Sequence, residues 1–171
     1  MELESLKTII TAKNNRARLC MIEVLNLILP KDPEARVSEV KRNLLALYSS
    51  LTPNEVYGLV KAHPPAHCVK VFPAHLVIKG GEGEIIRKVV HYFSYNYRSP
   101  SVYVDCERRG SRLNCRQIEI GIGMSLAKLS AISYLSPHLV IYINLIDDNA
   151  VVSFMKKGQE KVSVTPSDLN I

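Results

Sequence analysis

The sequence has no apolar run approaching the roughly 20 residues that a helix needs to cross a bilayer. Its first ten residues, MELESLKTII, begin with acidic side chains and lack the positively charged and then apolar design of a secretory signal. From these two absences we expect a cytoplasmic protein with no membrane partner.

Cysteine is scarce, and its spacing is not that of a zinc site. The chain has four cysteines, far apart, with no C-x-x-C pair. We expect reduced thiols that fill the core as small apolar side chains, and no metal. The one alternative is a metal role for Cys106 and Cys115, which flank an arginine-rich stretch.

Recognisable catalytic patterns are also missing. There is no G-x-G-x-x-G fingerprint, no Gly-Lys-Ser/Thr phosphate loop and no nucleophile elbow. The histidines form no sequence constellation with an acid or a nucleophile; they are His63, His67, His75, His91 and His138. We therefore expect no catalytic residues and no cofactor.

The charge that is present is mainly positive. The chain has 22 Lys/Arg against 16 Asp/Glu, a net charge of +6. The excess is concentrated in residues 41–100, where eight bases face three acids. A basic balance favours a polyanion as partner, and without a long basic tail its surface must be assembled by folding.

Residues 1–75 predict a module with the element order β-α-β-β-α-β, which is ferredoxin-like. Asn14 or Asn15 can cap the first helix, and Thr52 with Glu55 forms a capping box for the second. The expected elements are a strand at 7–13, a helix with Leu19, Ile22, Leu25 and Leu29 facing the core, a hairpin at 36–50, a helix from Thr52 and a strand at 68–72.

Residues 76–171 predict a second module of the α/β (α+β) class with a βαβ unit and a C-terminal hairpin. The second helix should bury a stripe at helical spacing. The expected elements are a helix at 84–95, a strand at 101–107, a helix at 114–130 with Ile118, Ile122, Leu126 and Leu129 buried, and strands at 139–146 and 150–155.

The most informative stretch is Val102–Lys128, in which a predicted strand is followed by an arginine-rich loop and then by a capped helix. Arg108, Arg109 and Arg112 lie together in this loop, and Asn114 caps the helix. A helix N-terminus offers free backbone N–H groups, and arginine grips phosphate bidentately. This combination predicts an anion site, most plausibly for an RNA backbone. The alternative is a polar loop whose arginines pair with Glu107 or Asp148.

Topology should gather further basic residues at the same place. If the strands 101–107 and 139–146 are parallel, the arginine loop lies beyond their carboxyl ends, where ligands of βαβ units bind. Arg116 lies in the first turn of the helix, and Lys79 and Lys88 should reach the same end. The RNA site therefore comprises Lys79, Arg108, Arg109, Gly110, Arg112, Asn114 and Arg116.

Three other stretches carry features of an RNA or phosphate site. Gly80–Glu84 is better explained as a helix entry than as a phosphate loop, because its glutamates would repel a phosphate. In HYFSYNYR, the side chains Tyr95, Tyr97 and Arg98 could stack on single-stranded RNA. The bases at positions 13, 16 and 18 could form an accessory patch, although a solvated surface explains them as well.

The second module resembles the THUMP domain, an RNA-binding module of tRNA-modifying proteins such as 4-thiouridine synthetases and several tRNA methyltransferases. The matching residues are VYVDCERRGSRLNCRQIEIGIGMSL, then SPHLVIYI and the hairpin to Met155. Upstream, LILPKDPEARV, SLTPNEV and the Pro-Pro break are similar to the ferredoxin-like half that often precedes a THUMP domain. Nearly the whole chain is covered.

The resemblance implies binding at the acceptor 3′ end of tRNA, with phosphate contacts from Arg108, Arg109 and Gly110. Ser111-Arg112-Leu113 departs from the family, where many members have a histidine or an aromatic residue after the glycine. The chain is similar to stand-alone THUMP proteins whose eukaryotic members are adaptors for tRNA cytidine acetylation.

Our sequence-based interpretation is an RNA-binding protein, not an enzyme by itself, without a cofactor. It would bind tRNA or another structured RNA and present it to a separate modifying enzyme of the acetyltransferase type. The alternative is a protein-interaction adaptor whose basic face binds an acidic protein.

Overall fold

The computed structural model describes residues 3–163 and confirms the mixed α/β class. The described chain forms two compact units, residues 3–74 with 158–163 and residues 75–157. Val162 packs in the core of the first unit, although the sequence assigned it to the second module. Positions 164–171 of that predicted module lie outside the described residues.

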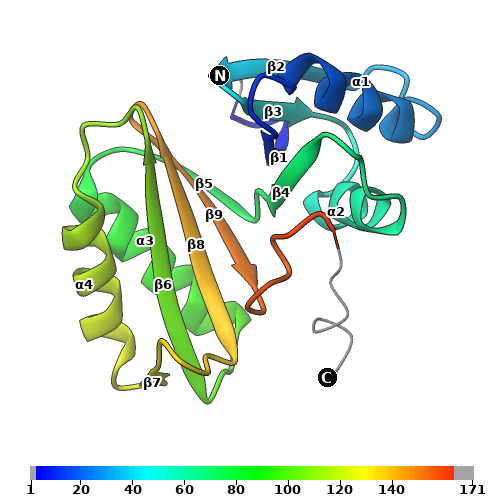
Figure 1. Cartoon of the computed structure of the whole chain (residues 1–171). Helices are drawn as coiled ribbons and strands as arrows, with labels where there is room; N and C mark the ends of the chain where they lie inside the picture. Colours follow the sequence, from blue (N-terminus) through cyan, green and yellow to red (C-terminus); the bar gives the residue numbers. More distant parts are fainter. Residues whose placement is uncertain (1–2, 164–171) are drawn as a thin grey trace. The chain divides into compact units, whose positions relative to one another are not determined.

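The first unit is a four-stranded antiparallel sheet with two helices (Figure 1). Strand β3 lies between β1 and β2, so the sheet order is β2-β3-β1-β4, and the order of elements is the predicted β-α-β-β-α-β. The elements are β1 Leu6–Ala12, α1 Ala17–Ile28, β2 Arg36–Lys41, β3 Leu44–Tyr48, α2 Pro53–Ala62 and β4 Cys68–Pro73.

The start of α2 is as predicted. The side chain of Thr52 accepts a 3.2 Å hydrogen bond from the backbone N–H of Glu55. The Glu55 carboxylate in turn accepts a 2.7 Å bond from the N–H of Thr52, which completes the capping box.

The start and the buried face of α1 differ from the prediction. Arg16 precedes the helix without a side-chain cap, while Asn14 and Asn15 accept bonds from Asn43 and Arg42 of the β2–β3 turn. None of the residues expected to face the core is fully buried, and Leu19, Ile22 and Leu29 are exposed. The buried residues of the helix are Ala17, Cys20, Val24 and Ile28. Because α1 is apolar over a wide arc, its sequence does not select one face.

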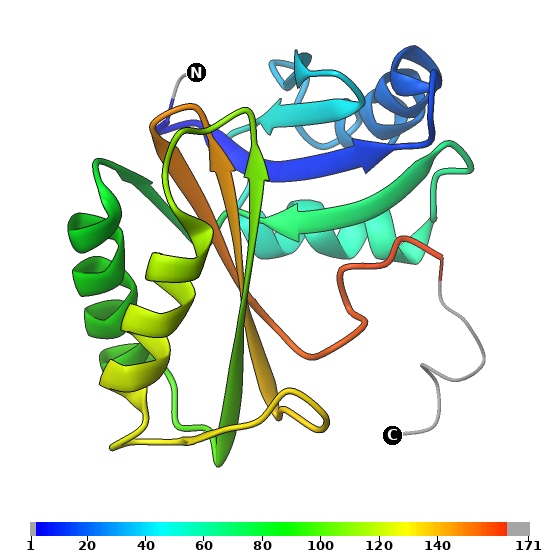
Figure 2. The same ribbon diagram turned by 60° about the vertical axis from the view of Figure 1, so that its left-hand side comes forward.

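The second unit is a five-stranded sheet of order β5-β9-β8-β6-β7 with both helices on one face (Figure 2). Strands β6 and β8 are parallel, and β8 and β9 form an antiparallel hairpin, which confirms the βαβ unit and the hairpin. Strands β5 and β7 were not predicted. The elements are β5 Leu76–Lys79, α3 Glu82–Asn96, β6 Ser101–Arg109, α4 Cys115–Leu126, β7 Ala131–Ile132, β8 Leu139–Ile146 and β9 Asn149–Met155.

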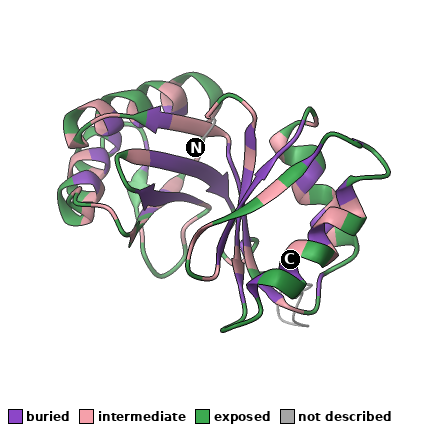
Figure 3. Ribbon diagram, turned by 90° about the horizontal axis from the view of Figure 1, so that it is seen from above, coloured by how far each residue is buried: buried purple, intermediate pink, exposed green. Residues whose placement is uncertain are grey.

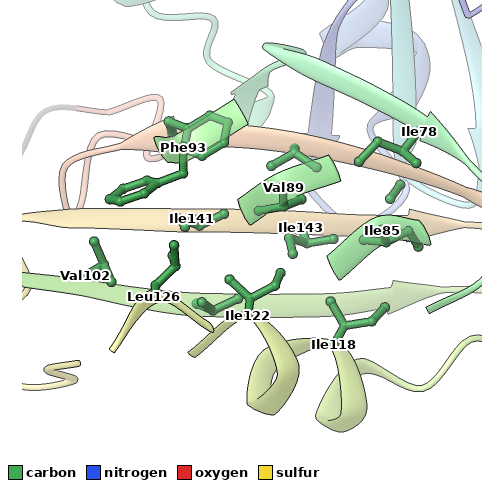
Figure 4. Packing of buried hydrophobic residues seen from close by; sticks show 14 of the residues in the cluster. Ile78, Ile85, Val89, Phe93, Val102, Ile118, Ile122, Leu126, Ile141 and Ile143 are labelled. Atoms are coloured by element: carbon green, nitrogen blue, oxygen red, sulfur yellow. The ribbon is translucent and has the colours of Figure 1, made fainter. Parts of the chain in front are cut away.

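The core of the second unit lies between its sheet and its helices (Figure 4). The predicted α4 stripe of Ile118, Ile122 and Leu126 is fully buried. Leu129 is 60% exposed because the helix ends at Leu126. Figure 3 shows the buried residues of α3 and α4 facing the sheet, with exposed residues on their outer faces.

The prediction of reduced cysteines was wrong. Disulfides join Cys20 to Cys68 and Cys106 to Cys115, with Cα–Cα distances of 5.1 and 5.4 Å. Sequence spacing does not report such pairing, because the fold brings α1 beside β4 and the start of α4 beside β6. Within residues 3–163, no group of three His, Cys, Asp or Glu residues is placed to hold a metal ion. No helix of this same range has the length and apolar character that a membrane span requires.

Candidate nucleic-acid interface

The carboxyl ends of three parallel strands meet the N-termini of two helices at one end of the second unit. Arg109 pairs with Ile146 across β6 and β8, and Lys79 at the end of β5 pairs with Asn149 at the start of β9. Both α3 and α4 begin here (Figure 2). The convergence expected from a parallel β6–β8 pair is therefore present.

Arg108 and Arg109 lie in strand β6 rather than in the following loop. Because side chains alternate along a strand, the two arginines point to opposite faces of the sheet. Arg108 is exposed, on the face where Val104 and Cys106 meet the helices. The structure therefore does not bring the two guanidinium groups together as the sequence suggested.

Arg109 is bound within the protein. Its Nε donates a 2.8 Å hydrogen bond to Oδ1 of Asn144, and a terminal nitrogen lies 2.7 Å from the carboxylate of Glu107. Its side chain is only 16% exposed. Burial lowers the pKa of Arg109, and the adjacent Glu107 opposes this shift. Arg109 thus serves β6–β8 packing in this structure.

Four other predicted bases remain available for a ligand. Lys79, Arg108, Arg112 and Arg116 are all exposed. Within residues 3–163 their side chains form no hydrogen bond or ion pair. We call these four residues, with the N-terminus of α4, the basic end. Lys79 lies on the opposite face of the sheet from Arg108, because Ile78 before it packs in the core on the helix side.

The loop between β6 and α4 is held at several points. Gly110 has a φ of 79°, a left-handed conformation that favours glycine, and forms a bridge with Ile146. The hydroxyl of Ser111 donates to the carbonyl of Asp147 and accepts from the N–H of Leu113. The Cys106–Cys115 disulfide closes the stretch that contains Arg108 and Arg112. This disulfide and the exact faces of the arginines had no signal in the sequence.

Asn114 and Glu82 occupy the helix N-termini at the basic end. The side chain of Asn114 caps α4 by accepting a 3.1 Å bond from the N–H of Gln117, so its oxygen is already engaged. The backbone N–H of Asn114 donates a 2.8 Å bond to the carboxylate of Glu82. This bond lowers the pKa of Glu82, which stays a carboxylate and places a negative charge beside the bases.

The other predicted contacts lie elsewhere. Lys88 forms an ion pair of 3.1 Å with Glu84 on α3. Tyr97 is half-buried and stacks on Phe154, while Arg98 donates to the carbonyls that end α3. The segment with Tyr95, Tyr97 and Arg98 is at the opposite end of β6 from Arg108. The basic side chains of Lys13, Arg16 and Arg18 are exposed on the first unit.

No protein family model and no curated protein sequence matches the chain. Solved structures do share its fold. PH1313 from Pyrococcus horikoshii Ot3 has a TM-score of 0.68 and 14% identity, over 88% of this chain and 54% of that protein. A 4-thiouridine synthetase, solved with RNA and ATP, has a TM-score of 0.54 and 10% identity, over 88% of this chain and 41% of its own.

A third similar structure is SMU.472, described provisionally as a methyltransferase and complexed with SAH. Its TM-score is 0.55 at 14% identity, over 87% of this chain and 41% of that protein. Two further similar structures also carry methylase descriptions. Because these three similar structures carry methyltransferase or methylase descriptions, the expectation that the chain is not an enzyme is contradicted. The chain spans about half the length of the structures it matches, and it has the fold that they share.

Proposed function

We propose that this chain binds tRNA through the basic end and presents it to a tRNA-modifying catalytic centre. The observation that carries the proposal is the group of exposed cations at the end of the second unit where the capped helix α4 begins, since within residues 3–163 these four side chains form no hydrogen bond or ion pair. The resemblance of the second unit to the THUMP domain supports it. The shared fold with a 4-thiouridine synthetase solved in complex with RNA supports it further.

The chemistry of the basic end suits a phosphodiester backbone. Three of the four cations are arginines, whose planar forks hold phosphate oxygens bidentately. The free N–H groups and dipole of α4 add a positive pole. Binding should depend strongly on salt, because each phosphate contact releases counterions.

The family resemblance implies that the acceptor 3′ end of the tRNA is the part recognised. Unpaired nucleotides can stack on side chains and be read by contacts to their base edges, which duplex RNA does not offer to the same degree. The resemblance to adaptors of tRNA cytidine acetylation implies an acetyltransferase as the catalytic centre served. The similarity to a 4-thiouridine synthetase and to a methyltransferase supports sulfur transfer or methyl transfer, as alternatives to acetyl transfer, as the reaction of this catalytic centre.

The test is fluorescence anisotropy with labelled tRNA over a salt series. The double variant Arg108→Ala/Arg112→Ala should weaken binding at least tenfold and lower the salt slope by about 0.7–0.9 for each lost phosphate contact. Arg87→Ala is the matched control, since Arg87 is an exposed arginine of the same unit but is paired with Glu84. Removal of the 3′-terminal nucleotides should weaken binding to the wild type.

Absence of binding at low salt would refute the RNA proposal. Equal losses in the double variant and the Arg87→Ala control would refute the assignment to the basic end. Binding of acidic proteins but not of tRNA would instead favour the alternative of a protein-binding basic face.

A further inference from the structure

The two disulfides differ in how easily a reductant can reach them. Cys20 and Cys68 are buried in the first unit, at 0% and 5% exposure. Cys106 and Cys115 are both partly exposed, and their bond joins strand β6 to the first residue of α4. Thiol–disulfide exchange requires that a thiolate reach one of the two sulfur atoms. The Cys106–Cys115 bond is therefore the one that is open to a dithiol in the folded protein.

This accessible disulfide belongs to the basic end. It closes residues 107–114, which contain Arg108 and Arg112, and Arg116 follows Cys115 directly. Arg108 lies on the same face of β6 as Cys106, because side chains two positions apart in a strand share a face. A chemical change at these sulfur atoms thus takes place among the cations that we assign to RNA.

The position of Cys115 favours cleavage of the bond. Cys115 is the first residue of α4, and a helix N-terminus stabilises a thiolate through its dipole and its free N–H groups. Arg116, the next residue, adds a positive charge that acts in the same direction. A sulfur that is stable as a thiolate is also the better leaving group in thiol–disulfide exchange.

We propose that the Cys106–Cys115 disulfide is a redox switch of RNA binding, which a dithiol opens and which lowers the affinity of the basic end for RNA when it is open. The inference rests on the proposed function, because it concerns regulation of the same site.

The exchange has two steps. A thiolate of the dithiol attacks Sγ of Cys106, the bond between the two protein sulfur atoms breaks, and its electron pair leaves on Sγ of Cys115. The second thiol of the reductant then loses its proton and attacks the reductant sulfur of the mixed disulfide, so that Sγ of Cys106 leaves and takes up a proton. The protein disulfide gains two electrons, and the dithiol is oxidised to a disulfide.

Reduction weakens RNA binding for two reasons. The thiolate of Cys115 adds a negative charge at the N-terminus of α4, where it competes with a phosphate for the same N–H groups and cations. The segment 107–114 also loses its covalent closure, so Arg108 and Arg112 must be ordered when RNA binds, at a cost in entropy.

The fold around the switch has other ties that do not depend on the disulfide. The N–H of Cys106 donates a 2.9 Å bond to the carboxylate of Glu119 on α4, and the N–H of Asn114 donates to Glu82 on α3. These bonds hold the start of α4 beside β6 and α3 in the reduced protein, so the change stays at the basic end.

The first measurement follows the thiols and needs no RNA. The protein is equilibrated at pH 7 in mixtures of reduced and oxidised dithiothreitol and then alkylated, and mass spectrometry quantifies each cysteine. Cys106–Cys115 should be half reduced at a ratio of reduced to oxidised dithiothreitol at least about tenfold lower than Cys20–Cys68 requires. Equal ratios for the two disulfides would overturn the inference.

The second measurement is anisotropy with labelled tRNA at constant salt, in a mixture that reduces only Cys106–Cys115. Affinity of the wild type should fall by at least about threefold relative to the oxidised protein. Two variants form a matched pair, since both lack the disulfide: Cys106→Ser keeps the thiol at the helix start and should bind more weakly than Cys115→Ser, which does not. Cys106→Ser/Cys115→Ser should bind tRNA equally well with and without the reductant.

The outcomes separate the two proposals. Equal tRNA affinity of the oxidised and reduced wild type would overturn the redox switch and leave the RNA proposal standing. A response to reductant that persists in Cys106→Ser/Cys115→Ser would also overturn it, because the effect would then belong to Cys20–Cys68. Absence of tRNA binding in both redox states would refute the proposed function, and the switch of RNA binding with it.

Discussion

The guanidinium of Arg109 donates to the amide oxygen of Asn144 on the neighbouring strand at 2.8 Å, and Asn144 is only 2% exposed. This bond satisfies a buried polar side chain. It also separates the roles of two adjacent arginines, since Arg108 on the other face of β6 has no partner among the described residues.

Arg109→Ala should lower the free energy of unfolding by about 1–3 kcal/mol, because it leaves the Asn144 amide buried without its donor. Arg108→Ala should change it by less than about 0.5 kcal/mol, as exposed substitutions usually do. Urea denaturation measures both. Equal stability of the two variants would contradict the structural role of Arg109.

Glu82→Gln should strengthen tRNA binding several-fold. The change removes a negative charge at the basic end while its amide oxygen can still accept the bond from the Asn114 N–H. Anisotropy at low salt measures the gain, and Glu34→Gln, an exposed position on the first unit, provides a control with the same change in net charge. A similar gain in both variants would indicate a general charge effect rather than a local one.

The two disulfides should contribute unequally to stability. Loop-closure entropy predicts about 4 kcal/mol for Cys20–Cys68, which are 48 residues apart, and about 2–3 kcal/mol for Cys106–Cys115, which are 9 apart. Cys20→Ala/Cys68→Ala should therefore lower the Tm more than Cys106→Ala/Cys115→Ala. A reductant should destabilise the wild type but not a variant that lacks all four cysteines.

Asp32 should make stability depend on acid pH. Its carboxylate accepts bonds from the Ser49 hydroxyl at 2.6 Å and the Ser50 N–H at 2.7 Å, and these bonds lower its pKa below the ordinary 3.8. A lowered pKa in the folded state stabilises the protein above the ordinary value, and this contribution is lost as the pH falls through the folded-state pKa.

Asp32→Asn should consequently be less stable than the wild type at pH 7, with a smaller difference between the two at pH 3. Urea midpoints at both pH values test this. Glu34→Gln, an exposed neighbour, should follow the wild-type pH profile if the effect belongs to Asp32.

Two glycines of α4 offer a matched pair. A Cβ at Gly121 would lie 2.5 Å from Cδ1 of Ile86 on α3, whereas a Cβ at Gly123 would meet nothing within 4 Å. Gly123→Ala should stabilise the protein by up to about 1 kcal/mol through helix propensity. Gly121→Ala should be less stable than Gly123→Ala by about 1–3 kcal/mol, as in overpacked cores. Equal melting temperatures would show that Ile86 moves aside without cost.

Local patterns in the sequence determined much of the fold. The spacing of Ile118, Ile122 and Leu126 identified the buried face of α4, and Thr52 with Glu55 identified the start of α2. These signals act within one or two helical turns, where backbone geometry alone fixes which side chains are neighbours. The element order then restricted the second unit to a βαβ arrangement, because parallel strands require a crossover.

Tertiary structure decided the features that depend on long-range register. The strand reaches Arg109, one pair of residues further than predicted, so Arg108 and Arg109 diverge to opposite faces. The wide apolar arc of α1 allowed several inward faces, and packing selected the one that carries Cys20 to Cys68. The sequence by itself thus located a basic segment at a helix start, while only the fold determined which of its arginines are free, since side-chain direction depends on strand pairing and partners far along the chain.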